Sequence, residues 1–217
     1  MNFSALLATA SYSGIYNYNL SVQLANLQMI NATGVNIVRI DMDFDPWLKN
    51  DTAQINQMDA IVNAIKADGK QVCIADGSAE SYRKSPLSWQ QFEAAFVARV
   101  KTIAALYHPY CYIVVKEPGW YYPMISPLSL QKYSAGPWVN LTESLISAVK
   151  NVSPNTKIGV AVPGSTIYHG NNDNFALDYM TAATKINGLS FLGFDDYGQQ
   201  DLADTMRFVN QTNLDGK

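Results

Sequence analysis

The sequence has few cysteines and histidines, and this scarcity excludes several kinds of site. Its two cysteines, Cys73 and Cys111, are too few for a disulfide framework. They are expected at different depths in two neighbouring strands, which favours buried free thiols over a bridge. Its two histidines, His108 and His169, are too few for a His-rich zinc site. The nucleotide-binding motifs G-x-G-x-x-G and G-x-x-x-x-G-K-[ST] are also absent, so no metal or organic cofactor is expected.

A strong charge of one sign and a long apolar run are missing too. The formal net charge is −3 and no basic stripe occurs, which argues against nucleic acid as a partner. No apolar run reaches the roughly 18 residues of a membrane span. A chain of 217 residues can bury one sizeable core, so we expect a single domain over residues 1–217.

Glutamate is rare, and one glutamate has a distinctive position. Of the four, Glu93 and Glu143 fall on helical patterns and Glu80 falls in a loop. Glu117 directly follows the β-branched stretch 112–115 and Lys116, and Pro118-Gly119 then breaks the chain. Because a short apolar run bounded by turn residues is typical of a buried strand, Glu117 is predicted at a strand's carboxyl end. The structural alternative is a strand-end Glu paired with Lys116.

Strand and helix patterns alternate along the chain. After a weak strand candidate at 3–12, strands are predicted to start near residues 35, 71, 111, 157 and 189, at intervals of 36, 40, 46 and 32 residues. Amphipathic or capped helical patterns lie between them, including a capping box at 88–91. This alternation predicts βα units around a parallel sheet. In such folds the sites lie at the carboxyl ends of the strands.

Carboxylates and aromatic residues gather after these strands. The members of this set are Asp41, Asp43, Asp45, Trp47, Asp76, Ser78, Glu80, Tyr82, Glu117, Trp120, Tyr121, Tyr122, Ser165, Tyr168, His169, Asp195, Asp196 and Tyr197. Aromatic rings pack on the C–H faces of sugars, and carboxylates accept hydrogen bonds from sugar hydroxyls. Glycosidic cleavage also requires carboxyl groups as acid and as nucleophile or base. Trp89 and Trp138 start helices and are predicted to be packing residues.

Acceptor triplets of the N-x-[ST] type are more frequent than the composition explains. Chance would give about two, and the chain has seven. They begin at Asn2, Asn19, Asn31, Asn50, Asn140, Asn151 and Asn210. We therefore expect an exported, extracellular or cell-surface glycoprotein.

Several of these stretches resemble clan A glycoside hydrolases, the cellulase-like, family 5-like (β/α)8 barrels. Val38-Arg39-Ile40 looks like the second-strand V-R-I of the clan, and 88–107 looks like its third helix. Glu117-Pro118 looks like the fourth-strand N-E-P, and 194–197 looks like the sixth-strand stretch near the site. The resemblance implies a retaining glycosidase of a β-linked polysaccharide or oligosaccharide, with Glu117 as general acid/base. Residues expected to bind the substrate are Arg39, Asp76, Lys116, Trp120, Tyr168, Asp195 and Tyr197.

Two features depart from that pattern. Lys116 stands where the clan has the Asn that holds a sugar hydroxyl, and Lys accepts no hydrogen bond and carries a charge. Only six βα units are visible, so the sequence resembles an α/β TIM-type barrel truncated before the seventh strand, which carries the clan's nucleophile. The nucleophile is then expected beyond Lys217, and the chain as given is expected to be inactive by itself. A second chain or a further segment is expected to complete the barrel.

Other functions remain open at this point. An inverting hydrolase could pair Glu117 with Asp195 or Asp196, and Asp76 is a third candidate for that role. A non-catalytic carbohydrate-binding barrel would explain Lys116 and the missing strand. A structural surface-layer protein is favoured only by the number of glycosylation triplets.

Overall fold

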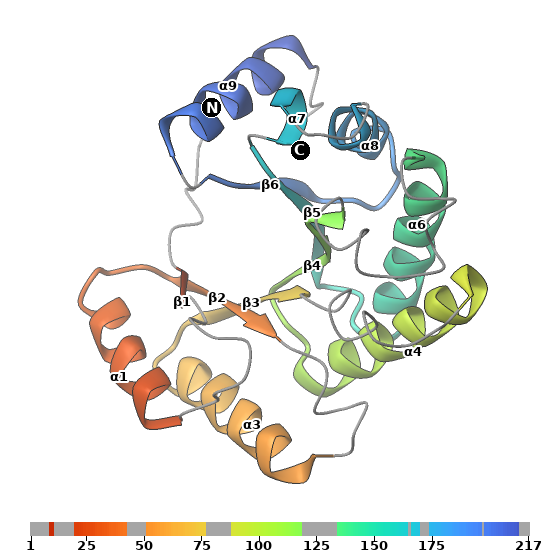
Figure 1. The fold of residues 1–217 in the computed structure, drawn as a ribbon. Helices are drawn as coiled ribbons and strands as arrows, with labels where there is room; N and C mark the ends of the chain where they lie inside the picture. The colour runs from red at the N-terminus through yellow and green to blue at the C-terminus, as the bar shows by residue number, and fades with distance from the viewer. Residues whose placement is uncertain are drawn as a thin grey trace.

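The computed structural model gives the fold of most of the chain (Figure 1). It describes residues 9–10, 20–42, 51–76, 88–118, 134–164, 166–169, 174–196 and 198–212. Trp47, Trp120, Tyr121, Tyr122 and Tyr197, which were expected among the strand-end residues, lie outside these ranges. None of the helices in this part of the chain is both long and apolar enough to cross a membrane.

The described strands form one parallel sheet of the order β1-β2-β3-β4-β5-β6. Their bounds are Thr9–Ala10 (β1), Ile37–Met42 (β2), Gln71–Asp76 (β3), Cys111–Lys116 (β4), Lys157–Pro163 (β5) and Phe191–Asp195 (β6). Each strand pairs in parallel with the next one along the chain, and each connection includes helix. The sheet is therefore an incomplete (β/α) barrel of the TIM type, as the sequence predicts. Within the described chain, β1 and β6 each pair on one side only, so they form the two edges of the arc.

Helices surround the convex side of this arc (Figure 1). Their bounds are Leu20–Asn31 (α1), Thr52–Ala67 (α3), Trp89–Tyr107 (α4), Ala135–Val152 (α6), Thr166–His169 (α7), Phe175–Ala183 (α8) and Gln199–Gln211 (α9). Local sequence explains where they begin and end. Asp51 caps α3 by accepting a hydrogen bond from the Gln54 backbone N–H, and Gly69 follows the helix at φ +71°. The predicted capping box of α4 is confirmed, with both reciprocal hydrogen bonds between Ser88 and Gln91.

Alternation along the strands separates two apolar layers. Val38, Ile40 and Met42 of β2 face the helices and belong to the large core, which also contains Phe92 and Trp138. Trp138 is 2% exposed and packs edge-to-face on Trp89, so both Trp are packing residues as predicted. The opposite strand faces form a smaller inner layer consisting of Cys73, Ala75, Cys111, Ile113 and Ala161. Because side chains alternate along a strand, the residues that continue this inner face toward the carboxyl ends are aimed at the site.

One β-bulge changes the direction of side chains in β4. Ile113 pairs with Gly159 and Val115 pairs with Val160, so Val114 is the extra residue. Val114 and Val115 both belong to the helix-facing core. The bulge therefore turns Lys116 to the inner side of the sheet, where regular alternation would have aimed it at the helices.

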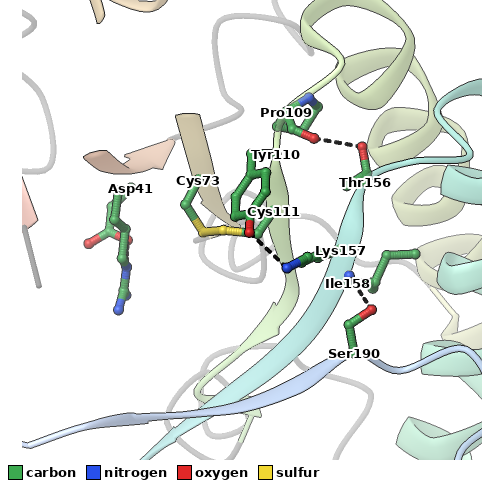
Figure 2. Close-up of a disulfide and its surroundings, with 10 residues drawn as sticks. Asp41, Cys73, Pro109, Tyr110, Cys111, Thr156, Lys157, Ile158 and Ser190 are labelled. Carbon is green, nitrogen blue, oxygen red and sulfur yellow. Dashed lines mark hydrogen bonds and ion pairs between the residues drawn. A yellow bond between two sulfur atoms is a disulfide. The ribbon is translucent and has the colours of Figure 1, made fainter. Parts of the chain in front are cut away.

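The structure contradicts the prediction of free thiols. Cys73 and Cys111 form a disulfide between β3 and β4 (Figure 2). The two residues are direct partners in the strand register, and their Cα atoms lie 4.5 Å apart, within the usual range for a disulfide. The prediction was wrong because approximate strand boundaries placed the two cysteines at different depths, whereas the parallel register sets them at the same level.

Candidate active site

A cluster of charged side chains occupies the inner side of the sheet above the apolar layer. We call it the charged cluster, and its members are Arg39, Asp41, Lys116, Glu117 and Asp195. Arg39 and Asp41 lie two residues apart on β2, so both face inward, while Lys116 and Asp195 are the last residues of β4 and β6. Four of its five members were singled out from the sequence as site residues, and the structure brings those four together.

Arg39 spans the concave side of the sheet from β2 to β6. Its Nη1 lies 2.5 Å from Asp195 Oδ1 and its Nη2 lies 3.2 Å from Asp195 Oδ2, a two-pronged ion pair. Its Nε lies 3.0 Å from Asp41 Oδ1. The side chains of Arg39 and Asp195 are 13% and 9% exposed, respectively. All three guanidinium nitrogens of Arg39 therefore donate hydrogen bonds to carboxylates of the chain itself.

Burial and charge pairing act in opposite directions on these groups. Burial opposes the charge on Arg39, but the hydrogen bonds and charges of Asp195 and Asp41 outweigh burial, so the pKa of Arg39 is raised above its usual value. Burial likewise opposes the charge on Asp195, and the Arg39 hydrogen bonds and charge outweigh it. The charge of Lys116 and a hydrogen bond from Glu117 act in the same direction, so the pKa of Asp195 is lowered.

Asp41 is the member of the cluster that the sequence analysis did not select for the site. Its Oδ2 lies 3.4 Å from Lys116 Nζ, so Asp41 bridges the two cations of the cluster. Its strand partner is Ala75 on β3, which carries a small, uncharged side chain. The signal was present in the sequence, because Asp41 follows Arg39 by two positions on a predicted strand and therefore shares its face.

Glu117 directly follows β4 and has an unusual backbone conformation. Its φ is +49°, which few residues other than glycine adopt, and its N–H donates to Ala161 O at 2.8 Å. Such a conformation costs on the order of 1–3 kcal/mol and persists where the surrounding structure fixes it, frequently at functional sites. Glu117 is also among the groups that lower the pKa of Asp195. The predicted partner Lys116 is instead recorded in an ion pair with Asp41.

Other predicted site residues lie elsewhere in the fold or outside the described ranges. Tyr168 on α7 stacks under the Arg207 guanidinium at 4.2 Å and donates to Gln211 Oε1 at 2.9 Å, so its recorded contacts are with α9. It borders a groove of about 560 Å³ between α7, α8 and α9. The backbone of Asp76 ends β3 as the register partner of Met42, and its side chain is outside the described part. Trp120 and Tyr197 also fall outside the described ranges.

The Arg39 ion pair restricts the chemistry available to Asp195. The guanidinium engages both oxygens of Asp195, at 2.5 and 3.2 Å, and the side chain of Asp195 is 9% exposed. An inverting glycosidase would need Glu117 and its partner carboxyl group roughly 6.5–9.5 Å apart. The pairing of Glu117 with Asp195 in that role stays a prediction. Asp196 is exposed and accepts a hydrogen bond from Thr205 on α9 at 2.8 Å.

Solved structures of similar fold include β-glycosidases. A family 1 β-glucosidase from Thermotoga maritima superposes with a TM-score of 0.61 at 11% identity, over 82% of this chain and 53% of that chain. The same enzyme in complex with azafagomine gives the same values, and a further β-glycosidase gives a TM-score of 0.56 at 13% identity. This chain spans about half the length of those proteins. No protein-family model matches the chain, and no curated protein matches it.

These likenesses define the class of fold, an incomplete (β/α) barrel similar to those of β-glycosidases. The neighbours named above include family 1 enzymes, so the family 5-like assignment is not confirmed. At 11–13% identity the comparison concerns the fold alone. Any function of the site therefore rests on the chemistry of the charged cluster.

Proposed function

We propose that the chain is part of a glycoside hydrolase acting on β-linked sugars, with Glu117 as general acid/base. The observation that carries this proposal is the position of Glu117. It follows β4 at the carboxyl edge of the barrel, has a positive φ, and donates its backbone N–H to Ala161 O. Sites of such barrels lie at that edge, and glycosidic cleavage begins with protonation of the leaving oxygen by a carboxylic acid.

The other members of the cluster have supporting roles in this proposal. Glu117 protonates the glycosidic oxygen and then, as a carboxylate, removes a proton from the incoming water. Lys116 donates hydrogen bonds to sugar hydroxyls in place of the Asn that resembling enzymes carry. Trp120 and Tyr197 are proposed as stacking surfaces for sugar rings. No step requires a metal or an organic cofactor.

A retaining mechanism requires a second carboxylate about 5–5.5 Å from Glu117. Asp195 is held by Arg39, with Nη1 of Arg39 2.5 Å from Asp195 Oδ1, so it is not free to attack a sugar. We therefore propose that the nucleophile belongs to a strand beyond this sequence, which would pair with β6. The same segment would cover an edge of the sheet.

The direct test is hydrolysis of a panel of aryl and oligosaccharide β-glycosides by the full-length gene product. Glu117→Gln is expected to lower kcat/KM by about 10²–10⁴-fold on substrates with poor leaving groups, because positioned acid catalysis contributes that much. Glu143→Gln is the matched control, since Glu143 is an exposed glutamate on α6. Equal activities of wild type and both variants would refute the assignment.

A second candidate is a non-catalytic carbohydrate-binding barrel, and one observation favours it. The guanidinium of Arg39 is engaged by Asp195 and Asp41, so it is less free to orient a nucleophile or a substrate. Sugar binding without turnover, with affinity unchanged in Glu117→Gln, would support this candidate. Turnover that is lost in the same variant would refute it.

We also propose that the protein is exported and glycosylated. The disulfide fits an oxidising compartment. Asn140, Asn151 and Asn210 are exposed on α6 and α9, whereas the amide of Asn31 donates to Asp68 and its Oδ1 is buried. Peptide mass analysis of protein from the native host should find glycans at the exposed asparagines. Unmodified peptides at all three would contradict the proposal.

A further inference from the structure

Lys116 is the cation of the charged cluster whose hydrogen-bond donors are least used by the chain itself. Its ammonium lies 3.4 Å from Asp41 Oδ2, its one ion-pair partner within the described part of the chain. An ammonium has three N–H donors, so two of them have no partner among the described residues. Arg39 differs, because all three of its nitrogens donate to Asp41 and Asp195. Of these two cations, Lys116 is therefore the one that can bind an anion of a ligand without breaking a close ion pair.

The backbone directs Lys116 to the concave side of the sheet. Lys116 is the last residue of β4, and the bulge at Val114 turns it to the inner face. Its side chain is 13% exposed, so solvent reaches the lysine but much of its hydration is lost. Its register partner on β5 is Ala161, and the inner face of β3 contributes Ala75, so both neighbouring strands present uncharged side chains there. A partly desolvated cation with unused donors gains more from an incoming anion than a fully exposed lysine does.

The paired charges of the cluster do not exclude an anionic ligand. Arg39 and Lys116 are cations, Asp41 and Asp195 are anions, and these four side chains are neutral in sum. Asp41 is shared between the cations, and Arg39 Nε lies closer to it, at 3.0 Å, than Lys116 Nζ does, at 3.4 Å. The charge of Lys116 is therefore the less completely compensated one. Glu117 adds no charge while it carries the proton that its proposed role requires.

We propose that Lys116 is a specificity-determining residue that gives the site a preference for sugars bearing an anionic group, a carboxylate or a sulfate ester. The inference rests on the proposed function, in which Lys116 contacts the sugar, and it adds which sugars are preferred. An ammonium binds either anion as a point charge, so the shared chemistry is one negative charge within hydrogen-bond reach of Nζ. A bound anion also offsets the positive charge next to Glu117 in the chain, which favours the protonated form that a general acid needs.

A matched set of oligosaccharides tests this preference on the full-length gene product. The set contains a β-linked oligoglucuronate, the same oligosaccharide with its carboxylates reduced to hydroxymethyl groups, and a sulfated form of the reduced one. Dissociation constants are measured by titration calorimetry at low salt for the wild type, Lys116→Gln and Lys101→Gln. We expect the wild type to bind one of the anionic forms about 10–100-fold more tightly than the neutral form, since a charge-assisted hydrogen bond contributes on that scale.

The two variants separate the charge of Lys116 from that of any other lysine. In Lys116→Gln, which keeps a donor and removes the charge, the ratio of the dissociation constants should fall to near one. Lys101→Gln changes an exposed lysine on α4 and should keep the wild-type ratio. Raising the salt concentration should reduce the preference of the wild type, because salt screens a partly exposed charge pair. If Lys116→Gln does not fold, Lys116→Met, which keeps the length of the side chain, replaces it.

The outcomes separate this inference from the proposed function. Equal affinities of the wild type for all three forms would overturn the inference, and so would a preference that persists in a folded Lys116 variant. The anionic form that binds more tightly identifies the group as a carboxylate or a sulfate ester. A preference that depends on Lys116, in a protein that hydrolyses no glycoside, would support the inference and contradict the proposed function. Hydrolysis of neutral glycosides that depends on Glu117, without any preference for anionic forms, would do the reverse.

Discussion

Loss of the Cys73–Cys111 disulfide is expected to destabilise the fold substantially. The bridge joins residues separated by 38 positions, and its closed loop contains the whole of α4. Loop-closure entropy in the unfolded chain gives a stabilisation of about 4 kcal/mol for a loop of this length. The bridge connects β3 and β4, so it also holds the strand that carries Lys116 and Glu117.

Equilibrium urea unfolding with and without a reductant measures this contribution. With a denaturant dependence of about 3 kcal/mol/M, a loss of 4 kcal/mol moves the midpoint down by roughly 1.3 M. The double variant Cys73→Ala/Cys111→Ala should unfold near the reduced wild type, because both lack the cross-link. Identical midpoints for oxidised and reduced protein would refute this reasoning. Two titratable thiols in unreduced, denatured protein would refute it as well.

Three further perturbations test the packing and electrostatics. Gly159→Ala should lower the free energy of unfolding by about 1–3 kcal/mol in urea unfolding, because a Cβ at Gly159 meets the ring of Phe191. Adding Phe191→Leu to that variant should recover part of the loss. Thr142→Val should cost about 1–3 kcal/mol in the same assay, because the Thr142 hydroxyl lies 2.8 Å from the fully buried Tyr179 hydroxyl. The lowered pKa of Asp195 stabilises the fold above its unfolded value of about 3.9, and this contribution is lost as pH falls through the folded value. The stability difference between wild type and Asp195→Asn should therefore shrink between about pH 6 and about pH 2.5.

The sequence predicts the strands and helices well because their signals are local. The capping box at Ser88 and Gln91 lies within four residues of chain, and it begins α4 as expected. The apolar run before Lys116 is bounded by turn residues, and it forms β4. The alternation of strands and helices was enough to predict a parallel sheet, and the resemblance to clan A enzymes implied a barrel with six visible units. Six paired strands are present in the described chain.

Strand register and contacts between side chains far apart in the sequence could not be predicted from local signals. The disulfide depends on Cys73 and Cys111 being direct partners, and a register error of one residue aims a side chain at the other face. The bulge at Val114 turns Lys116 inward, and nothing in a short apolar run marks it. Arg39 and Asp195 are 156 positions apart, so no local pattern predicts their ion pair. The curvature of the sheet brings β2 and β6 close enough for it to form.

The candidate site was recognised in part for the same reason. Residue types at strand ends pointed to Glu117, Lys116 and Asp195, and the resemblance to clan A enzymes added Arg39. The pairing among them required the structure, which shows Arg39 bound to Asp195. The resemblance had implied that Arg39 binds the substrate, whereas its guanidinium is engaged by Asp195 and Asp41 of the chain itself.

The central claim is that Glu117 gives a proton to the leaving group, and leaving-group dependence tests it most directly. The measurement is kcat/KM of the full-length wild type and of Glu117→Gln on aryl β-glycosides whose phenols span a range of acidity. If Glu117 is the acid, the variant should lose about 10²–10⁴-fold on the poorest leaving groups and little on the best, since acidic phenols leave without a proton. An equal loss across the series, or no loss, would contradict the account.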